Sequence, residues 1–226
     1  MKRRMQSWDA RMIAFMRDAE AYNTYTRDLA EWILPHLNDD DEVCEAGCGM
    51  GQLALALANH VRSYIAFDRN EDALCDLREA AKTVKNLRVE CAEMESFQPD
   101  EPMDALLLCL VGGGEEVFTA AERMKCNRII EIIRRTPDEL WNKNPNGLDT
   151  DALPEGWRLA SKESKELPMN QPFRSFEDAR AFADLYLDEG LSDVELRAML
   201  RPIETNDFSF EFPVTRNLEM RVYIKE

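Results

Sequence analysis

Between residues 42 and 135 the chain alternates five times between a short apolar run and a stretch of helical periodicity or a turn. Apolar runs without polar alternation are typical of parallel strands buried on both faces. Because parallel neighbours need a long crossover, this order favours a doubly wound, mostly parallel α/β sheet. The expected strands are 42–45, 63–67, 87–90, 104–111 and 128–133, and the expected helices are 52–59, 70–83 and 115–124.

The flanking segments follow other patterns. Apolar residues recur at helical intervals from Asp9 to Leu37, whereas 136–156 is rich in Pro, Asn and Gly. Capping signatures at Ser175 and Ser192 predict two later helices. Alternating residues in 207–212 and 218–224 predict an antiparallel hairpin that closes a seven-stranded sheet. We therefore expect one domain over 1–226, with a helical lid at 9–37, a core at 42–135, an insertion or substrate cap at 136–206 and the hairpin at 207–226.

Composition and charge restrict the location, partners and metals that we expect for this protein. Hydrophobic residues make up 45%, and no apolar run approaches the roughly 20 residues of a membrane span. The N-terminal residues lack the uninterrupted apolar stretch of a secretory signal, so a cytoplasmic location is expected. The net charge of −16 argues against a nucleic-acid partner, because phosphate backbones are repelled. Six scattered cysteines without C-x-x-C spacing and two histidines give no zinc pattern, so no metal is expected.

One turn carries most of the functional information. Glu45-Ala46-Gly47-Cys48-Gly49-Met50-Gly51 lies between a predicted strand and a predicted helix. Glycines there let the backbone approach a ligand closely. The spacing G-x-G-x-G followed by Gln52 departs from the G-x-G-x-x-G of dinucleotide sites, and a Walker-type Gly-Lys-Ser/Thr ending is absent. The acidic Glu45 would repel a phosphate and favours a cationic amine instead.

This turn resembles the (Asp/Glu)-x-Gly-x-Gly-x-Gly signature of class I S-adenosylmethionine-dependent methyltransferases, whose fold is Rossmann-like. The resemblance runs in order from Glu42 to Ile133 and extends to the terminal hairpin. It implies that the turn holds the amino-acid part of S-adenosylmethionine and that Glu45 orients its ammonium end. Asp68, 23 positions later at the end of the second strand, would accept the ribose hydroxyls.

The resemblance also assigns the remaining contacts. Similar proteins often have an Asp where this chain has Cys91, so adenine contact is expected from the backbone N–H of Ala92 and from Glu93. Cys109 and Leu110, at the end of the fourth strand, would lie near the transferred methyl group. The implied cofactor-binding residues are Glu45, Ala46, Gly47, Cys48, Gly49, Gly51, Asp68, Arg69, Ala92, Glu93, Cys109 and Leu110.

The expected activity is methyl transfer from S-adenosylmethionine to a small-molecule acceptor. No residue is assigned as a general base, and the oligomeric state is left open. The aromatic content of 141–203 favours a small, partly apolar substrate under a lid. The alternatives are a non-catalytic protein that binds S-adenosylmethionine or S-adenosylhomocysteine, a methyltransferase acting on protein or RNA, and a nicotinamide-dependent oxidoreductase.

Overall fold

A computed structural model describes residues 9–111, 114, 116–135, 153–187 and 190–226. The chain forms two compact units, which are described in turn. The larger comprises 26–166 and 217–226, and the smaller comprises 1–25 and 167–216. The expected lid segment therefore contributes to both units. The glycines at 112–113 and most of the loop at 136–156 lie outside the described residues.

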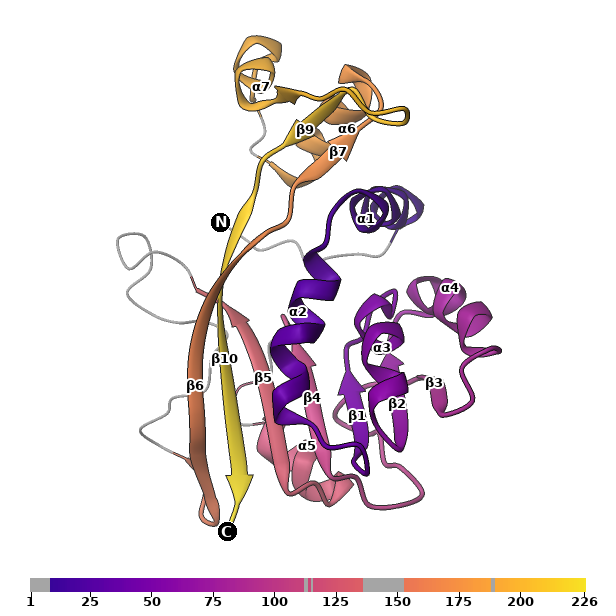
Figure 1. Ribbon diagram of the computed structural model, residues 1–226, viewed down its shortest axis with the longest axis vertical. Coiled ribbons are helices and arrows are strands. Elements are labelled where there is room, and N and C mark those ends of the chain that lie inside the picture. Colours follow the sequence, from indigo (N-terminus) through magenta and orange to yellow (C-terminus); the bar gives the residue numbers. More distant parts are fainter. Residues whose placement is uncertain (1–8, 112–113, 115, 136–152, 188–189) are drawn as a thin grey trace. The chain divides into compact units, whose positions relative to one another are not determined.

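The larger unit contains a seven-stranded sheet in the order β3-β2-β1-β4-β5-β10-β6 (Figure 1). The pairs β1–β2, β1–β4, β2–β3 and β4–β5 are parallel, and β10 runs antiparallel to β5. The predicted fold class, a mostly parallel doubly wound sheet, is confirmed. The strands are β1 (Glu42–Ala46), β2 (Ser63–Asp68), β3 (Leu87–Cys91), β4 (Ala105–Cys109), β5 (Arg128–Arg134), β6 (Trp157–Pro168) and β10 (Thr215–Lys225).

Helices bury both faces of this sheet. Helix α5 packs Val117, Phe118 and Met124 against Leu106 and Leu108 of the central strand β4. Figure 1 shows α2 on the opposite face of the sheet. Burial on both faces explains why β4 is apolar without alternation. The helices of this unit are α2 (Tyr25–Ile33), η1 (Leu34–His36), α3 (Gln52–Leu57), η2 (Ala58–His60), α4 (Glu71–Ala81) and α5 (Glu116–Met124).

The helical pattern at 9–37 is interrupted. Helix α1 (Ala10–Tyr22) ends at Asn23, whose backbone is extended, and α2 begins at Tyr25. The side chain of Asn23 accepts the backbone N–H of Tyr25 and donates to the carbonyl of Asn170. These two bonds replace helical ones, so an asparagine ends the helix without a glycine or proline.

The smaller unit combines α1 with a three-stranded sheet in the order β7-β9-β8. Phe15 of α1 packs edge-on against Phe173 and Phe182, with ring centroids 6.1 and 5.3 Å apart. The capping boxes at Ser175 and Ser192 are both formed, as predicted. The remaining elements are β7 (Gln171–Phe173), α6 (Phe176–Tyr186), α7 (Asp193–Met199), β8 (Arg201–Pro202) and β9 (Phe210–Phe212).

The closing hairpin differs from the expectation. Strand β9, within the expected first arm, pairs with β7 and β8 in the small sheet. Strand β10 instead lies in the large sheet between β5 and β6. Strand β6 forms the edge of that sheet and runs in the opposite direction to β10 (Figure 1). Alternating apolar and polar residues predict a strand with one buried face, but they do not specify which strand it pairs with.

Candidate functional site

The glycine turn follows β1 and opens α3 as expected. Gly47, Gly49 and Gly51 all have positive φ, at 68°, 55° and 73°. The N–H of Cys48 donates to the carbonyl of Phe67 on β2 at 3.1 Å, and the N–H of Gly51 donates to the carbonyl of Cys48 at 2.9 Å. Three left-handed residues in five favour glycine at each position.

Two of these glycines are also required by packing. A Cβ at Gly47 would lie 2.4 Å from Cγ2 of Val111, and one at Gly51 would lie 2.3 Å from Cδ2 of Leu77. Both distances are far below van der Waals contact. The turn is therefore held between the end of β4 and helix α4, and its glycines have a structural role besides any ligand contact.

Asp68, at the end of β2, is bonded to the turn. Its Oδ2 accepts the N–H of Gly49 at 2.9 Å, and its Oδ1 accepts the N–H of Asn70 at 2.8 Å. The residue is only 8% exposed. Each carboxylate oxygen can accept a second hydrogen bond, so the group is oriented and still able to bind two hydroxyls.

Glu45 is a buried acid without a positive partner in the described structure. It is 2% exposed, and its Oε2 accepts the hydroxyl of Tyr64 at 2.9 Å. Burial, reinforced by repulsion from Asp68, raises the pKa of Glu45 to about 7 although the Tyr64 donor acts to lower it. Tyr64 was not predicted as a site residue, because a tyrosine inside an apolar strand is typical of core packing.

The end of β3 differs from what the resemblance implies. The N–H of Ala92 donates to the carbonyl of Asp68 at 3.0 Å, so it is already engaged. The exposed thiol of Cys91 donates to the carbonyl of Arg69 at 3.6 Å. Glu93 is exposed, and its carbonyl accepts the N–H groups of Ser96 and Phe97. The contacts expected of Ala92 and Glu93 with a ligand stay predictions.

A strained residue directly follows strand β4. Leu110 has φ 60°, a conformation that costs a non-glycine residue about 1–2 kcal/mol, and its side chain is 37% exposed. Its N–H donates to the carbonyl of Ile132 at 2.8 Å. Cys109, the last residue of β4, is partly buried. Backbone strain at an exposed strand end is typical of functional sites.

The carboxyl ends of β1, β2, β3 and β4 carry all twelve predicted residues at one edge of the sheet. The chain runs from β1 outward to β2 and β3, and then returns to place β4 on the other side of β1. In open α/β sheets ligands bind at such a switch point. The glycine turn after β1 lies there.

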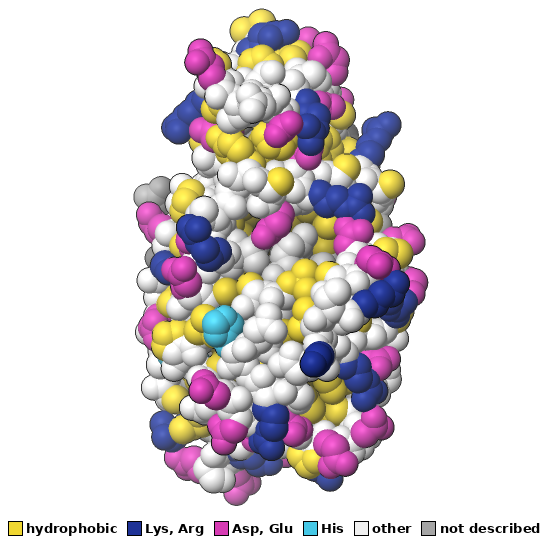
Figure 2. All heavy atoms as spheres, turned by 45° about the vertical axis from the view of Figure 1, so that its right-hand side comes forward, with side chains coloured by type: hydrophobic (Ala, Val, Ile, Leu, Met, Phe, Trp, Pro, Cys, Tyr) yellow, Lys and Arg dark blue, Asp and Glu magenta, His cyan; other side chains and the backbone are white. Residues whose placement is uncertain are grey.

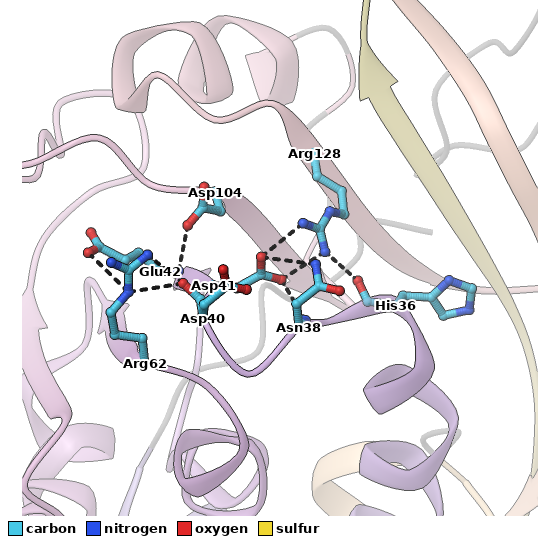
Figure 3. Close-up of polar contacts among 8 residues, drawn as sticks. All are labelled: His36, Asn38, Asp40, Asp41, Glu42, Arg62, Asp104 and Arg128. Carbon is cyan, nitrogen blue, oxygen red and sulfur yellow. Dashed lines mark hydrogen bonds and ion pairs between the residues drawn. The ribbon is translucent and has the colours of Figure 1, made fainter.

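The amino ends of the strands carry a different polar network (Figure 3). Arg128 donates to both carboxylate oxygens of Asp41, at 2.8 and 3.1 Å, and to the carbonyl of His36. The N–H of Glu42 donates to Asp104 at 2.8 Å. A cavity of about 410 Å³ at this end is lined by residues that include Ser63, Leu87 and Arg88. Because it opens at the edge opposite the glycine turn, we assign it no part in the candidate site.

No helix among the described residues is long and apolar enough to cross a bilayer. Within the same residues, no three His, Cys, Asp or Glu side chains gather as a metal site.

Known proteins resemble this chain in one domain and in fold. Residues 43–125 match the methyltransferase domain family model. A proposed methyltransferase from Bacillus halodurans C-125 superposes with a TM-score of 0.56 at 15% identity, covering 90% of this chain and 99% of that one. No curated protein matches the chain.

Two other solved structures have the same fold. Coclaurine N-methyltransferase, bound to N-methylheliamine and S-adenosylhomocysteine, gives a TM-score of 0.54 at 10% identity over 88% of this chain and 72% of that one. A proposed RNA methyltransferase from Pyrococcus horikoshii gives 0.53 at 11% identity, over 88% and 81%. The larger unit is thus a Rossmann-like methyltransferase fold. The glycine turn, Asp68 and the predicted residues at the ends of β3 and β4 all lie within the residues 43–125 that match the methyltransferase domain model.

Proposed function

We propose that this protein binds S-adenosylmethionine at the carboxyl edge of β1–β4 and transfers its methyl group to an acceptor. The observation that carries the proposal is the glycine turn itself. It lies at the switch point of a methyltransferase domain, with Asp68 bonded to Gly49 and with Glu45 buried without a cationic partner among the described residues. The twelve residues predicted for the site are proposed as the binding residues.

The chain's groups fit this cofactor. Asp68 has lone pairs for the ribose hydroxyls, and the acidic pair Glu45 and Asp68 favours a ligand with positive charge. The cofactor supplies a methyl group on a sulfonium, which is already activated for transfer. The protein then has to align the acceptor and exclude water, and we place this task at Cys109 and Leu110. No described residue is proposed as a general base.

We propose a small-molecule acceptor. Coclaurine N-methyltransferase, with N-methylheliamine bound, is one neighbour of this fold that holds a small molecule. The net charge of −16 disfavours a phosphate backbone, and the face in Figure 2 intersperses acidic with basic side chains. Phe173 and Phe182 do not support an aromatic lid over the substrate, because Phe173 is 2% exposed and Phe182 packs against it. A protein or RNA acceptor remains the alternative, and a cytoplasmic location remains a prediction.

Calorimetric titration with S-adenosylmethionine and S-adenosylhomocysteine tests the binding site. We expect micromolar affinity that falls at least tenfold in Asp68→Ala, because the ribose loses its acceptor (about 1.5–3 kcal/mol for hydrogen bonds to a charged group). Asp100→Ala is the matched control, since Asp100 is an exposed carboxylate near the opposite edge. Absence of binding by the wild-type chain, or equal affinities in the two variants, would contradict the proposal.

Transfer of a labelled methyl group distinguishes an enzyme from a non-catalytic binder. Pools of small amines, phenols and thiols are compared with bulk RNA and protein as acceptors. Labelling of the small molecules supports the proposal, whereas labelling of intact RNA or protein alone moves the acceptor to the alternative. A fluorescence titration with NADH, which we expect to show no binding, tests the alternative of a nicotinamide-dependent oxidoreductase.

A further inference from the structure

Glu45 and Tyr64 form a buried pair on one face of the sheet. Strands β1 and β2 are parallel with Glu45 opposite Ala66, so the side chain of Tyr64 projects on the same face two residues earlier. Its hydroxyl reaches Oε2 of Glu45 at 2.9 Å. Tyr64 is fully buried and Glu45 is 98% buried. The pair is therefore almost completely removed from water.

The surroundings of Glu45 are acidic or apolar. Strand β2 contributes Tyr64 and Asp68, and the neighbouring segment contributes the thiols of Cys44 and Cys48. On its other side β4 places Leu107 opposite Glu45. Helix α3, which follows the turn, buries only apolar residues. No Lys, Arg or His of the described structure is among the groups that shift the pKa of Glu45.

A buried carboxylate without a cation is costly, so Glu45 binds a proton when nothing else neutralises it. A ligand ammonium placed at the turn supplies the missing charge and removes the need for that proton. The hydroxyl of Tyr64 stays a donor, because burial raises its own pKa well above the usual value. A donor stabilises the ionised acid more than the neutral one.

We propose that Glu45 carries a proton in the ligand-free protein and releases it when a cationic ligand binds, with Tyr64 as the positioning residue that holds the ionised carboxylate. The O–H bond of the carboxyl group breaks, the electron pair stays on the oxygen, and the proton passes to solvent. This inference rests on the proposed function, since S-adenosylmethionine and S-adenosylhomocysteine both carry an ammonium group.

Calorimetry in two buffers with different ionisation enthalpies counts the protons released. With S-adenosylhomocysteine we expect close to one proton at pH 6 and almost none at pH 8.5, because the free carboxyl titrates near pH 7. As the pH rises, affinity should increase about tenfold per pH unit up to about pH 6 and level off above about pH 7. Glu45→Gln should bind without proton release and without this rise.

Tyr64→Phe keeps the volume of the ring and removes the donor. We expect proton release to persist up to higher pH, and affinity at pH 6 to fall about tenfold, corresponding to a shift of about one pH unit in the profile. A purely structural role would lower affinity equally at every pH. Tyr223→Phe is the matched control, because Tyr223 donates to buried Glu131 on β5 in the same sheet, away from the turn. Its proton count and affinity should equal those of the wild type.

The outcomes separate the two claims. Tight binding by the wild type without proton release refutes this inference and leaves the proposed function standing. If Glu45→Gln still releases a proton on binding, the proton does not come from Glu45. If the pH dependence of affinity is unaltered in Tyr64→Phe, Tyr64 does not hold the ionised carboxylate. If the wild type binds neither ligand, both claims fall. The wild-type proton count needs no variant, so the test does not depend on Tyr64→Phe folding.

Discussion

Replacing Gly47 by alanine should destabilise the protein for two separable reasons. Its φ of +68° costs a residue with a Cβ about 1–2 kcal/mol. The new Cβ would also lie 2.4 Å from Cγ2 and 3.2 Å from Cγ1 of Val111. Forcing a methyl group into such a contact costs about 1–3 kcal/mol. We therefore expect a total loss of about 2–5 kcal/mol in the free energy of unfolding.

Two further variants separate these costs. Gly156→Ala is the control for backbone strain, because Gly156 has φ +82° and nothing lies within 4 Å of an added Cβ. Val111→Ala removes both methyl groups and leaves only Cβ, at 3.4 Å, in the path of the new side chain. In the Val111→Ala background, Gly47→Ala should therefore cost only about as much as Gly156→Ala. The double-mutant cycle should give a coupling of about 1–3 kcal/mol.

Urea unfolding measures each variant, with tryptophan fluorescence and far-ultraviolet circular dichroism as probes. Buried Trp157 reports on the larger unit. Equal destabilisation of Gly47→Ala and Gly156→Ala would refute this prediction, as would a cost of Gly47→Ala that is the same with and without the Val111 methyl groups. Either result would mean that Val111 does not occupy the space above the turn.

Two further predictions concern buried charges. Burial raises the pKa of Glu131 from 4.5 to about 7, so the wild-type free energy of unfolding should fall by about 3 kcal/mol through this residue as the pH rises from about 4 to 8. Glu131→Gln should flatten that fall, and an unchanged pH profile of unfolding would contradict the prediction. Arg128→Ala leaves the buried carboxylate of Asp41 without its partner and should cost about 3–5 kcal/mol at pH 7. Hydrogen bonds from Arg128 and Asn38 outweigh burial and lower the pKa of Asp41, so the cost of Arg128→Ala should shrink in acid. Arg62→Ala, which removes an exposed arginine, is the control and should cost under about 1 kcal/mol. Equal losses of stability in the two variants would refute the prediction.

The central sheet could be predicted because its signals are local. Apolar runs mark β1, β2, β4 and β5, and the right-handed crossover rule restricts how parallel strands can be connected. The glycine turn was recognisable because its backbone conformation demands that residue type. In each case the sequence pattern and the structure follow from the same short segment.

The smaller unit could not be predicted in this way, because long-range contacts build it. Asn23 ends α1 through a bond to Asn170, which is 147 positions away. Tyr22 of the same helix donates to Glu211 at 2.8 Å. Neither partner is visible in the helix's own sequence, so the segment 9–37 was predicted as one element.

Parts of the candidate site were hidden for a similar reason. Tyr64 acquires a polar role only because its hydroxyl reaches Glu45 on the neighbouring strand. The N–H of Ala92 is engaged because the edge of β3 turns back onto the carbonyl of Asp68. Both depend on how neighbouring strands are aligned, which residue types alone do not specify.

The two-segment construction of the smaller unit has a consequence for the order in which the chain matures. Helix α1 leaves the ribosome long before β7, α6 and β9, whose side chains complete its core. During that interval Phe15 has none of its native aromatic neighbours. The larger unit likewise requires β10, which is made after both of its neighbours, between β5 and β6. Neither unit can close until these later segments have been made, so the nascent chain exposes apolar surface during that interval and should engage chaperones while it is translated.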